Sequence, residues 1–298
     1  MTGSLISPVL VQLILAGFAT GAVYALVALG YTLIWNAVGV VNFAQGDLVM
    51  LGAFVAVGTL ANSLHLPLAL TLVGTLGVMG IFGLAVATFV YRPVRNRPQL
   101  AAIVATLGLS MLLQNVVVLI WGPEPLSFAG PFGTETVNVL GAKIYAQYLL
   151  ILGTLLLLMA LQEGMFRFTS IGRAMRATAQ DAEAARLMGM RTTRIVAIIF
   201  AYASMLAGLA GWLLSPLFYV SADMGGKVSL DAFAACILGG FGSIPGALIG
   251  GLLLGLIESL GSFYISSEYI DVIAFGILFA MLVVRPEGIF GEPQLERP

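Results

Sequence analysis

Apolar segments without a charged residue follow one another along the whole chain, separated by short polar stretches. Most of these segments are long enough for one transmembrane helix of about 20 residues, and some are long enough for more. A porin-like barrel would instead show segments of about ten residues with alternating polarity, and the sequence has no such alternation. The pattern therefore predicts an all-α bundle of membrane-spanning helices. The uncharged segments are residues 1–46, 48–91, 98–123, 144–162, 195–222 and 232–257.

Polar and glycine-rich interruptions divide these segments into individual spans. The first segment has a polar break at Asn36, Gly39 and Asn42, and the stretch GGFGSIPG at 239–246 is expected to end one helix before the next begins. Because the first segment and the short span 229–241 are ambiguous, we expect eight or nine transmembrane helices, some of them broken. They form a single domain over residues 1–298 and lie near 9–30, 44–62, 67–91, 99–121, 144–162, 195–217, 229–241, 246–264 and 270–284.

The composition agrees with a chain that uses lipid as its solvent. Hydrophobic residues make up 60% of the sequence, charged residues 9%, and the mean hydropathy is +1.04, which leaves too few charges to coat a soluble domain. The N-terminus lacks a basic region and a small-residue cleavage site, so we expect the chain to be mature protein. The single Cys236 and the single His65 exclude a disulfide framework and argue against a Cys/His metal site. Nothing suggests a nucleic-acid partner.

Basic residues predict the orientation in the membrane. Nine charged residues fall within 163–194, six of them arginines, and they give this segment a net charge of +3 in a chain of net −1. Arg92, Arg95 and Arg97 form a second basic turn, and such an excess of positive charge marks loops on the cytoplasmic side. Three expected spans precede the second turn. We therefore expect the N-terminus outside and the tail from Arg285 in the cytoplasm.

A short cytoplasmic helix is expected within the basic segment, over residues 178–190. Thr178 and Asp181 resemble an N-terminal capping pair, and Gly189 is expected to end the helix. An apolar face on a cytoplasmic loop either docks into a groove of a partner protein or rests on the bundle or the lipid headgroups. The residues alone leave both alternatives open. At the spacing i, i+3 and i+4, this face consists of Ala184, Leu187 and Met188.

Polar side chains inside apolar segments are candidates for a translocation path. Asp47 is the only acidic residue among the first 123, and a charge at bilayer depth costs about 2.5–3.5 kcal/mol on insertion scales. Asn42 and Asp47 either cap the amides of a broken helix or line a path. The other polar positions either form hydrogen bonds between helices or line the path, and the glycine break either borders the path or forms a turn. The path candidates are Asn42, Gln45, Asp47, Gln114, Asn115, Gly239, Gly240, Gly242 and Glu258.

Motifs of catalysis are absent from the sequence. There is no phosphate-cradling G-x-x-x-x-G-K-[ST], no H-E-x-x-H and no G-x-S-x-G. We therefore expect a protein that is not an enzyme, that cannot hydrolyse ATP itself, and that holds no cofactor or metal.

Six stretches, spread over nearly the full length, carry a recognisable pattern: GYTLIWNAVGVVNFAQGDLVMLGAF (30–54), YRPVR (91–95), LGLSMLLQN (107–115), IGRAMRATAQDAEAARLMGM (171–190), GGFGSIPGALIGGLLLGLIES (239–259) and VVRPEGIFG (283–291). They resemble, in the family's order, the branched-chain amino acid permeases of the LivH type. Gln45 stands where this family frequently has histidine.

The cytoplasmic segment also resembles the coupling-loop signature of ABC importer permeases, in which a short helix docks into the ATPase subunit. Glu183-Ala184-Ala185-x3-Gly189 is followed after ten residues by Ile199. The Leu-Pro pair that usually comes next is replaced by Ala201-Tyr202. The resemblance implies that the residues of ATPase coupling are Thr178, Asp181, Glu183, Ala184, Ala185, Arg186, Leu187, Met188 and Gly189.

The resemblance implies the membrane-spanning subunit of an ABC importer for hydrophobic branched-chain amino acids in the inner membrane. It also implies a related second permease subunit, two cytoplasmic ATPase subunits that use the ATP, and a periplasmic substrate-binding protein. Permeases for urea or short amides share much of the pattern, so this cargo stays an alternative. The rival class is a stand-alone transporter driven by an ion gradient through Asp47, Asp231 or Glu258.

Overall fold

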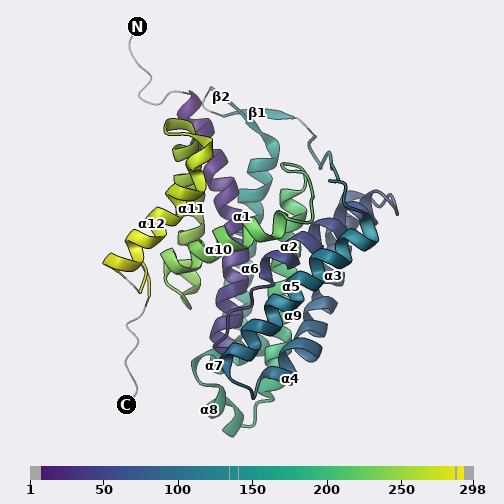
Figure 1. The fold of residues 1–298 in the computed structure, drawn as a ribbon, viewed down its shortest axis with the longest axis vertical. Helices are drawn as coiled ribbons and strands as arrows, with labels where there is room; N and C mark the ends of the chain where they lie inside the picture. Colours follow the sequence, from purple (N-terminus) through teal and green to yellow (C-terminus); the bar gives the residue numbers. More distant parts are fainter. Residues whose placement is uncertain (1–7, 134, 140, 286, 292–298) are drawn as a thin grey trace.

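The computed structural model describes residues 8–133, 135–139, 141–285 and 287–291, and most of these residues are helical (Figure 1). In chain order the elements are α1 (Pro8–Val38), α2 (Gln45–Phe54), the π-helical η1 (Val55–Ala61), α3 (Leu68–Ala85), the π-helical η2 (Val86–Tyr91), α4 (Arg92–Val94), α5 (Gln99–Trp121), β1 (Thr136–Val139), β2 (Ala142–Tyr145), α6 (Ala146–Phe168), α7 (Ser170–Gln180), α8 (Ala182–Leu187), α9 (Thr192–Leu214), α10 (Met224–Gly239), α11 (Ile244–Tyr264), the 3-10 helix η3 (Ser267–Tyr269) and α12 (Ile270–Val284).

In the described part of the chain, six helices are long and apolar enough to cross a membrane, which makes this an integral membrane protein. Two shorter apolar helices, Gln45–Ala61 and Ile270–Val284, accompany them. Helix α10 has 16 residues, and at 1.5 Å per residue it is about 24 Å long, short of a hydrocarbon core of about 30 Å. The expected spans at 44–62, 229–241 and 270–284 therefore correspond to shorter helices. The six long helices are Pro8–Val38, Leu68–Val94, Gln99–Trp121, Ala146–Phe168, Thr192–Leu214 and Ile244–Tyr264.

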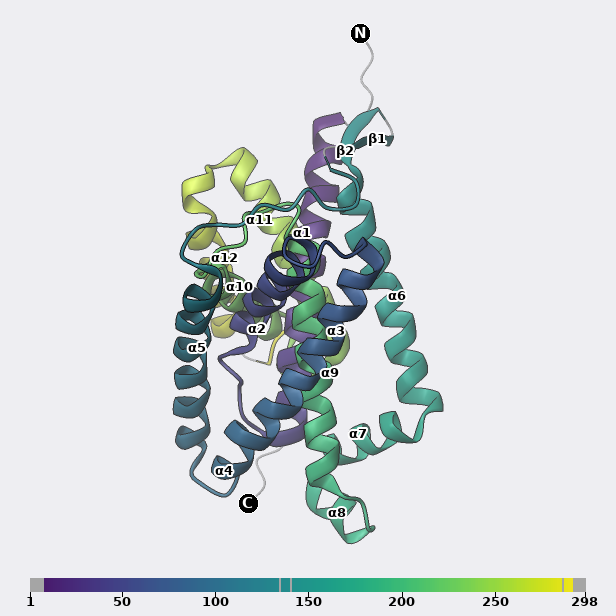
Figure 2. The same ribbon diagram turned by 90° about the vertical axis from the view of Figure 1, so that its right-hand side faces the viewer.

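Helices α1 and α9 form the centre of the bundle. In each of them 67% of the most apolar window is buried, against 22% in α5 and in α6. Helix α1 runs along the long axis of the molecule, and Figure 2 shows α5 and α6 on opposite sides of it. Large apolar side chains such as Leu119 and Leu156 are exposed on these outer helices, as expected for helices that face lipid.

Small residues allow the central helices to approach closely. A Cβ atom at Gly21 in α1 would lie 2.7 Å from the carbonyl oxygen of Gly251 in α11, and Gly255 meets the backbone of α1 one turn away. Small residues at this spacing thus let the two helix backbones approach closely. At Gly77, by contrast, an added Cβ would meet nothing within 4 Å.

A β-hairpin between α5 and α6 is a small departure from the predicted all-α bundle. Strands β1 and β2 are antiparallel, with Val137 opposite Ile144. Ala142 and Ile144 are buried and pack in one cluster with Val11 of α1. Because the hairpin buries these apolar side chains, α6 begins at Ala146 rather than at residue 144.

Helix α1 continues through Asn36, so the polar break begins later than expected. The Nδ2 atom of Asn36 donates a hydrogen bond of 2.7 Å to the carbonyl of Gly242, and this partner outside the helix leaves the backbone helical. Gly39 has a φ of +66°, a conformation that ends a helix at little cost for glycine. The chain then returns toward the middle of the molecule, where α2 begins at Gln45 (Figure 2).

Candidate functional site

The junction between α1 and α2 brings the first path candidates into the interior. Asn42 Oδ1 accepts a hydrogen bond of 3.3 Å from the amide of Ala44, and buried Gln45 donates one of 3.1 Å to the carbonyl of Ala203 in α9. Ala44 is the N-cap residue of α2, and no side chain caps this helix. Neither Asn42 nor Asp47 thus forms a side-chain cap of α2, although Asp47 lies in its first turn, where free amides stabilise a carboxylate. Asn42 stabilises the loop, and Gln45 joins α2 to α9.

Asp47 is buried where the first turns of two helices meet. The Nε2 atom of Gln114 in α5 donates a hydrogen bond of 2.9 Å to its Oδ1, and the side chain is 2% exposed. A Cβ atom at Gly225, in the first turn of α10, would lie 2.9 Å from the same oxygen. Carboxylates are stabilised near helix N-termini because the free amides there carry partial positive charge. Two helix starts and one amide thus stabilise this charge.

The neighbouring polar pair of α5 is divided between two environments. Gln114 points to Asp47, whereas Asn115 is exposed and donates a hydrogen bond of 2.7 Å to the carbonyl of Met111 in its own helix. Asn115 is therefore not brought together with the other path candidates.

A second polar group lies between α1, α10 and α11. The hydroxyl of Tyr24 donates a hydrogen bond of 2.8 Å to Oε2 of Glu258. Asp231 is 2% exposed, and its Oδ2 has no hydrogen-bond partner among the described residues. These three side chains line a cavity of about 480 Å³ together with Lys227. The sequence indicated both carboxyl groups but gave no signal for Tyr24, which lies in an uncharged apolar run.

The predicted break between α10 and α11 is confirmed. Helix α10 ends at Gly239, Gly240 and Gly242 have φ angles of +106° and +93°, and Ser243 caps α11 by accepting a hydrogen bond of 3.1 Å from the amide of Gly246. An added Cβ at Gly239 would overlap the carbonyl of Gly246. The glycines therefore permit both the tight turn and the close contact of the two helix ends.

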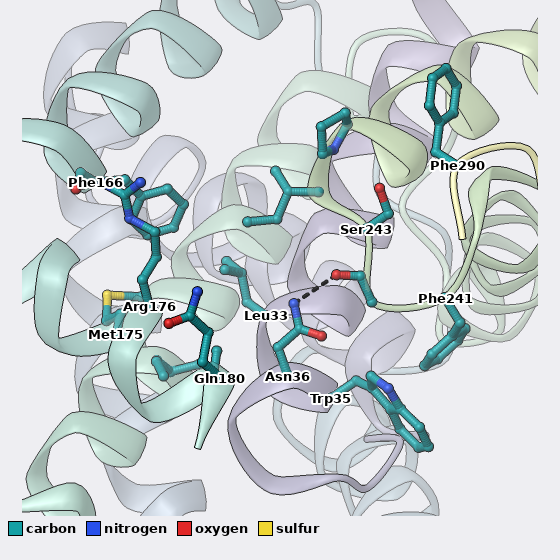
Figure 3. A pocket seen from close by; sticks show the side chains of 15 residues that line it. Leu33, Trp35, Asn36, Phe166, Met175, Arg176, Gln180, Phe241, Ser243 and Phe290 are labelled. Carbon is teal, nitrogen blue, oxygen red and sulfur yellow. Dashed lines mark hydrogen bonds between the residues drawn. The ribbon is translucent and has the colours of Figure 1, made fainter. Parts of the chain in front are cut away.

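A cavity of about 620 Å³ separates this break from α7 (Figure 3). Asn36 and Ser243 lie on one side of it, and Met175 and Arg176 of α7 lie on the other. Phe290 also lines the cavity, and its amide donates a hydrogen bond of 2.9 Å to the carbonyl of Gly239. The break and the basic segment thus face each other across an open space.

The basic segment contains two short helices rather than the one predicted over 178–190. Asp181 has an extended backbone, and its carboxylate accepts hydrogen bonds of 2.9 Å from the amides of Glu183 and Ala184. It therefore ends α7 and caps α8. Thr178 does not take part in this cap, because it is buried inside α7 and bonds to the carbonyl of Ala174.

Helix α8 presents most of its apolar side chains to solvent. Leu187 is 84% exposed and Met188 81% exposed, whereas Ala185 is buried. Gly189 follows with a φ of +84°, so its predicted role as the helix terminator is confirmed. Glu183, Ala184 and Arg186 are also exposed. The chain alone leaves this tip uncovered.

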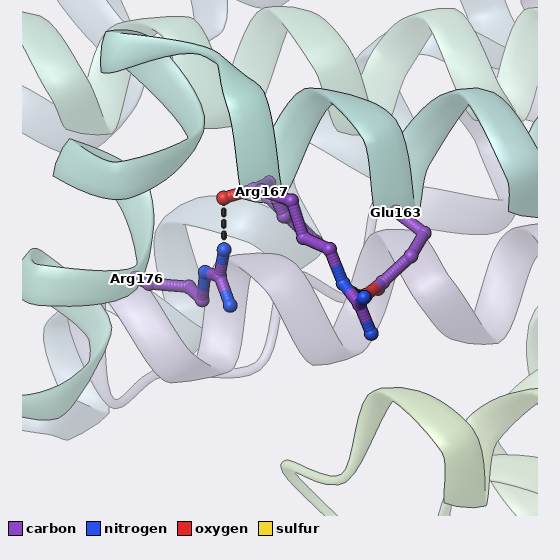
Figure 4. A network of polar contacts seen from close by, with 4 residues as sticks. Glu163, Arg167 and Arg176 are labelled. Atoms are coloured by element: carbon purple, nitrogen blue, oxygen red, sulfur yellow. Dashed lines mark hydrogen bonds and ion pairs between the residues drawn. The ribbon is translucent and has the colours of Figure 1, made fainter.

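The corner between α6 and α7 is fixed by backbone contacts. Arg176 donates a hydrogen bond to the carbonyl of Phe166 (Figure 4). Its Cζ lies 5.8 Å from the centroid of the Phe166 ring. Thr169 caps α7 by accepting a hydrogen bond of 3.0 Å from Gly172. The ion pair of Arg167 with Glu163 is exposed and stabilises the corner little. These contacts hold the first turns of α7 against the end of α6.

Comparison with known proteins identifies the family. Residues 13–282 match the model of the family described as the permease component of branched-chain amino acid transport systems. The chain is 35% identical over 294 residues to the high-affinity branched-chain amino acid transport system permease protein LivH of Escherichia coli, covering 94% of this chain and 95% of that protein. The chain belongs to this family of ABC transporter permeases, as the resemblance of its motifs predicted.

Two further relatives show how wide the similarity is. The permease protein BraD of a high-affinity branched-chain amino acid transport system in Pseudomonas aeruginosa is 35% identical over 299 residues, with 96% of this chain and 97% of that protein covered. The ribose import permease protein RbsC of Haemophilus influenzae is 24% identical over 272 residues, with 88% and 81% covered. Relatives named for different cargoes thus align with most of this chain.

Proposed function

We propose that this chain is the membrane-spanning subunit of an ATP-binding cassette importer that moves hydrophobic branched-chain amino acids across the inner membrane. The observation that carries the proposal is the 35% identity to LivH over nearly the whole of both chains. A related second permease completes the pathway, and a periplasmic binding protein delivers the substrate. Two cytoplasmic ATPase subunits use the ATP, and this chain holds no cofactor.

The exposed tip of α8 supports a mechanical coupling. Leu187 and Met188 would bury their apolar surface in a groove of the ATPase subunit. Closure of the ATPase dimer then displaces α8, and the capped junction at Asp181 passes this displacement to α7. Because α7 faces the α10–α11 break across a cavity, its movement changes the inner half of the pathway.

The coupling role proposed for α8 also sets the orientation of the chain in the membrane. The tip of α8 and the basic turn at α4 lie at one end of the molecule, and the β-hairpin lies at the other (Figure 1). The N-terminus and the hairpin are thus outside, and the C-terminus is cytoplasmic. Nine helical segments enter the bilayer in this proposal, but α2 and α10 begin within it. The loop before α2 buries Asn42 and Ala44, and part of the loop before α10 lines the cavity beside Tyr24. Irregular backbone survives at that depth in such settings, buried in protein or beside a water-filled cavity.

Transport by the reconstituted complex tests this proposal. The chain, its partner permease, both ATPase subunits and the binding protein are placed in proteoliposomes, and uptake of labelled leucine is measured with and without ATP inside the vesicles. We expect uptake that needs ATP and is unaffected by ionophores, with ATPase activity stimulated by leucine-loaded binding protein. Competition by urea or acetamide but not by valine would favour the alternative cargo. Uptake driven by an ion gradient without ATP would refute the importer assignment.

A further inference from the structure

The carboxylate of Asp231 combines deep burial with an incomplete set of hydrogen bonds. Its Oδ2 has no partner in the described part of the chain, although the residue is 98% buried. The neighbouring Glu258 already accepts a hydrogen bond from Tyr24, and both carboxyl groups line the same cavity of about 480 Å³. A buried carboxylate oxygen without a donor is costly, so the described residues leave Asp231 one hydrogen-bond donor short.

The side chains around the cavity do not meet this requirement. The hydroxyl of Thr20 bonds to backbone carbonyls of α1, and that of Ser259 bonds to the carbonyl of Leu13. Lys227 is the cation of the cavity lining, but it pairs with Asp271 at 3.7 Å. A ligand with a primary ammonium group would supply three donors. Such a group can bond to Asp231 and Glu258 together.

Lys227 gives the cavity a second charged element at a suitable spacing. Residues 227 and 231 are four apart in α10, so they lie on the same helix face about 5–6 Å apart between Cβ atoms. The pair of Lys227 with Asp271 is largely exposed on both sides, and such pairs are weak. The ammonium group of Lys227 can therefore exchange Asp271 for the carboxylate of a ligand. A cation site and an anion site one helical turn apart match the head of a zwitterionic amino acid.

The rest of the cavity is suited to an aliphatic side chain. Leu214, Phe218 and Ile270 contribute apolar surface, and the volume lies in the range typical of small-molecule sites, about 300–1,000 Å³. The lining residues of α1 lie between Ala16 and Tyr24, and those at 214–221 are the last residue of α9 and part of the loop after it. The N-terminal end of α1 and the C-terminal end of α9 both point away from α7 and α8 (Figure 1). The cavity therefore lies in the half of the molecule opposite the cytoplasmic helices.

We propose that this cavity is an amino-acid subsite within the permease, in which Asp231 and Glu258 bind the ammonium group of the substrate and Lys227 binds its carboxylate. The inference rests on the proposed function, because it places that importer's substrate in this subunit. Tyr24 acts as a positioning residue that orients Glu258. The site would take aliphatic amino acids one at a time after their release from the binding protein.

Competition between leucine and its truncated analogues tests the site without any variant. The complex in nanodiscs, without binding protein, is titrated with labelled leucine and then with 3-methylbutylamine, which lacks the carboxylate, or 4-methylpentanoate, which lacks the amino group. We expect the amine to displace leucine and the acid to fail. Equal displacement by the acid, or no saturable leucine binding, would overturn the proposal.

Variants then identify the residues. Asp231→Asn should weaken leucine binding about tenfold or more, because it removes a charge-assisted bond. Lys227→Met should weaken leucine binding but leave binding of the amine unchanged. Asp223→Asn is the matched control, because Asp223 is an exposed carboxylate just before α10, and it should bind leucine like the parent. Wild-type affinity in Asp231→Asn would refute the site while ATP-driven leucine uptake by the parent complex still upheld the importer function.

Discussion

Gln114 and Asp47 form a hydrogen bond of 2.9 Å that joins the outer helix α5 to the first turn of α2. Helix α5 is peripheral, since only 22% of its most apolar window is buried. Asp47 in turn lies against the start of α10 at Gly225. The side-chain amide of Gln114 therefore links a peripheral helix to the point where two helices begin inside the bundle, in addition to the hydrogen bonds that α5 makes through Thr106 and Trp121.

Replacing Gln114 by leucine should destabilise the protein. The substitution leaves the buried carboxylate of Asp47 without its amide donor, and such a loss costs about 1–3 kcal/mol. We expect a lower thermal unfolding midpoint in detergent and reduced leucine uptake. Asn115→Leu is the matched control, because Asn115 is exposed and bonds only to its own helix. Equal midpoints for the two variants would show that the bond to Asp47 has no energetic role.

Gly30 provides the space for the side chain of Gln45, and Gly30→Ala tests this packing. An added Cβ would overlap the amide of Gln45, and overpacking in a close-packed interior costs about 1–3 kcal/mol. We expect lower thermal stability for Gly30→Ala and no change for Gly77→Ala, where the added methyl group meets open space.

The double variant Gly30→Ala with Gln45→Ser separates the overlap with Gln45 from any other effect of alanine at position 30. The shorter serine side chain removes the overlap, so the stability lost in Gly30→Ala should be partly recovered, as expected for residues in contact. Additive losses in the double variant would show that Gly30 acts independently of Gln45.

The sequence could predict the long helices because their information is local. The apolar run expected at 99–121 coincides with α5 (Gln99–Trp121), and the glycine break at 239–246 separates α10 from α11. The hairpin at 136–145 was missed because its strands have four residues each. Four positions are too few to show reliably the alternation of apolar and polar residues by which a strand is identified.

The polar pairs could not be predicted, because their members are far apart in the chain. Gln114 lies 67 positions from Asp47, and Tyr24 lies 234 positions from Glu258. Each residue alone is an isolated polar group in an apolar run, and only the packing of helices decides its partner. At Asp181 the failure has a different cause: a capping box and a direct cap use the same residue types, so the sequence did not determine which residue caps the helix.

Gly189→Val should uncouple ATP hydrolysis from transport without preventing insertion. A β-branched residue at a φ of +84° is strained, and the strain would distort the end of α8 beside Leu187 and Met188. We expect normal amounts of protein in the membrane but a loss of the ATPase stimulation by loaded binding protein. Gly164→Val is the control, since Gly164 in α6 has open space and no positive φ. Unchanged stimulation in Gly189→Val would remove α8 from the coupling mechanism.

Cysteine labelling tests the orientation and the docking of α8 together. Cys236 is the only cysteine of the chain and is buried, so a membrane-impermeant maleimide should leave the parent protein unlabelled. Asn138→Cys in the exposed strand β1 should react in intact spheroplasts. Met188→Cys should react only after permeabilisation, because the proposed orientation places α8 in the cytoplasm.

Co-expression of the ATPase subunits supplies the second part of this measurement. Burial of the α8 tip in the ATPase should slow the labelling of Met188→Cys, whereas Asn138→Cys should react at the same rate with and without these subunits. Reaction of Met188→Cys in intact spheroplasts would reverse the proposed topology. Equal labelling of Met188→Cys in both strains after permeabilisation would mean that the exposed apolar tip is not the surface on which the ATPase acts.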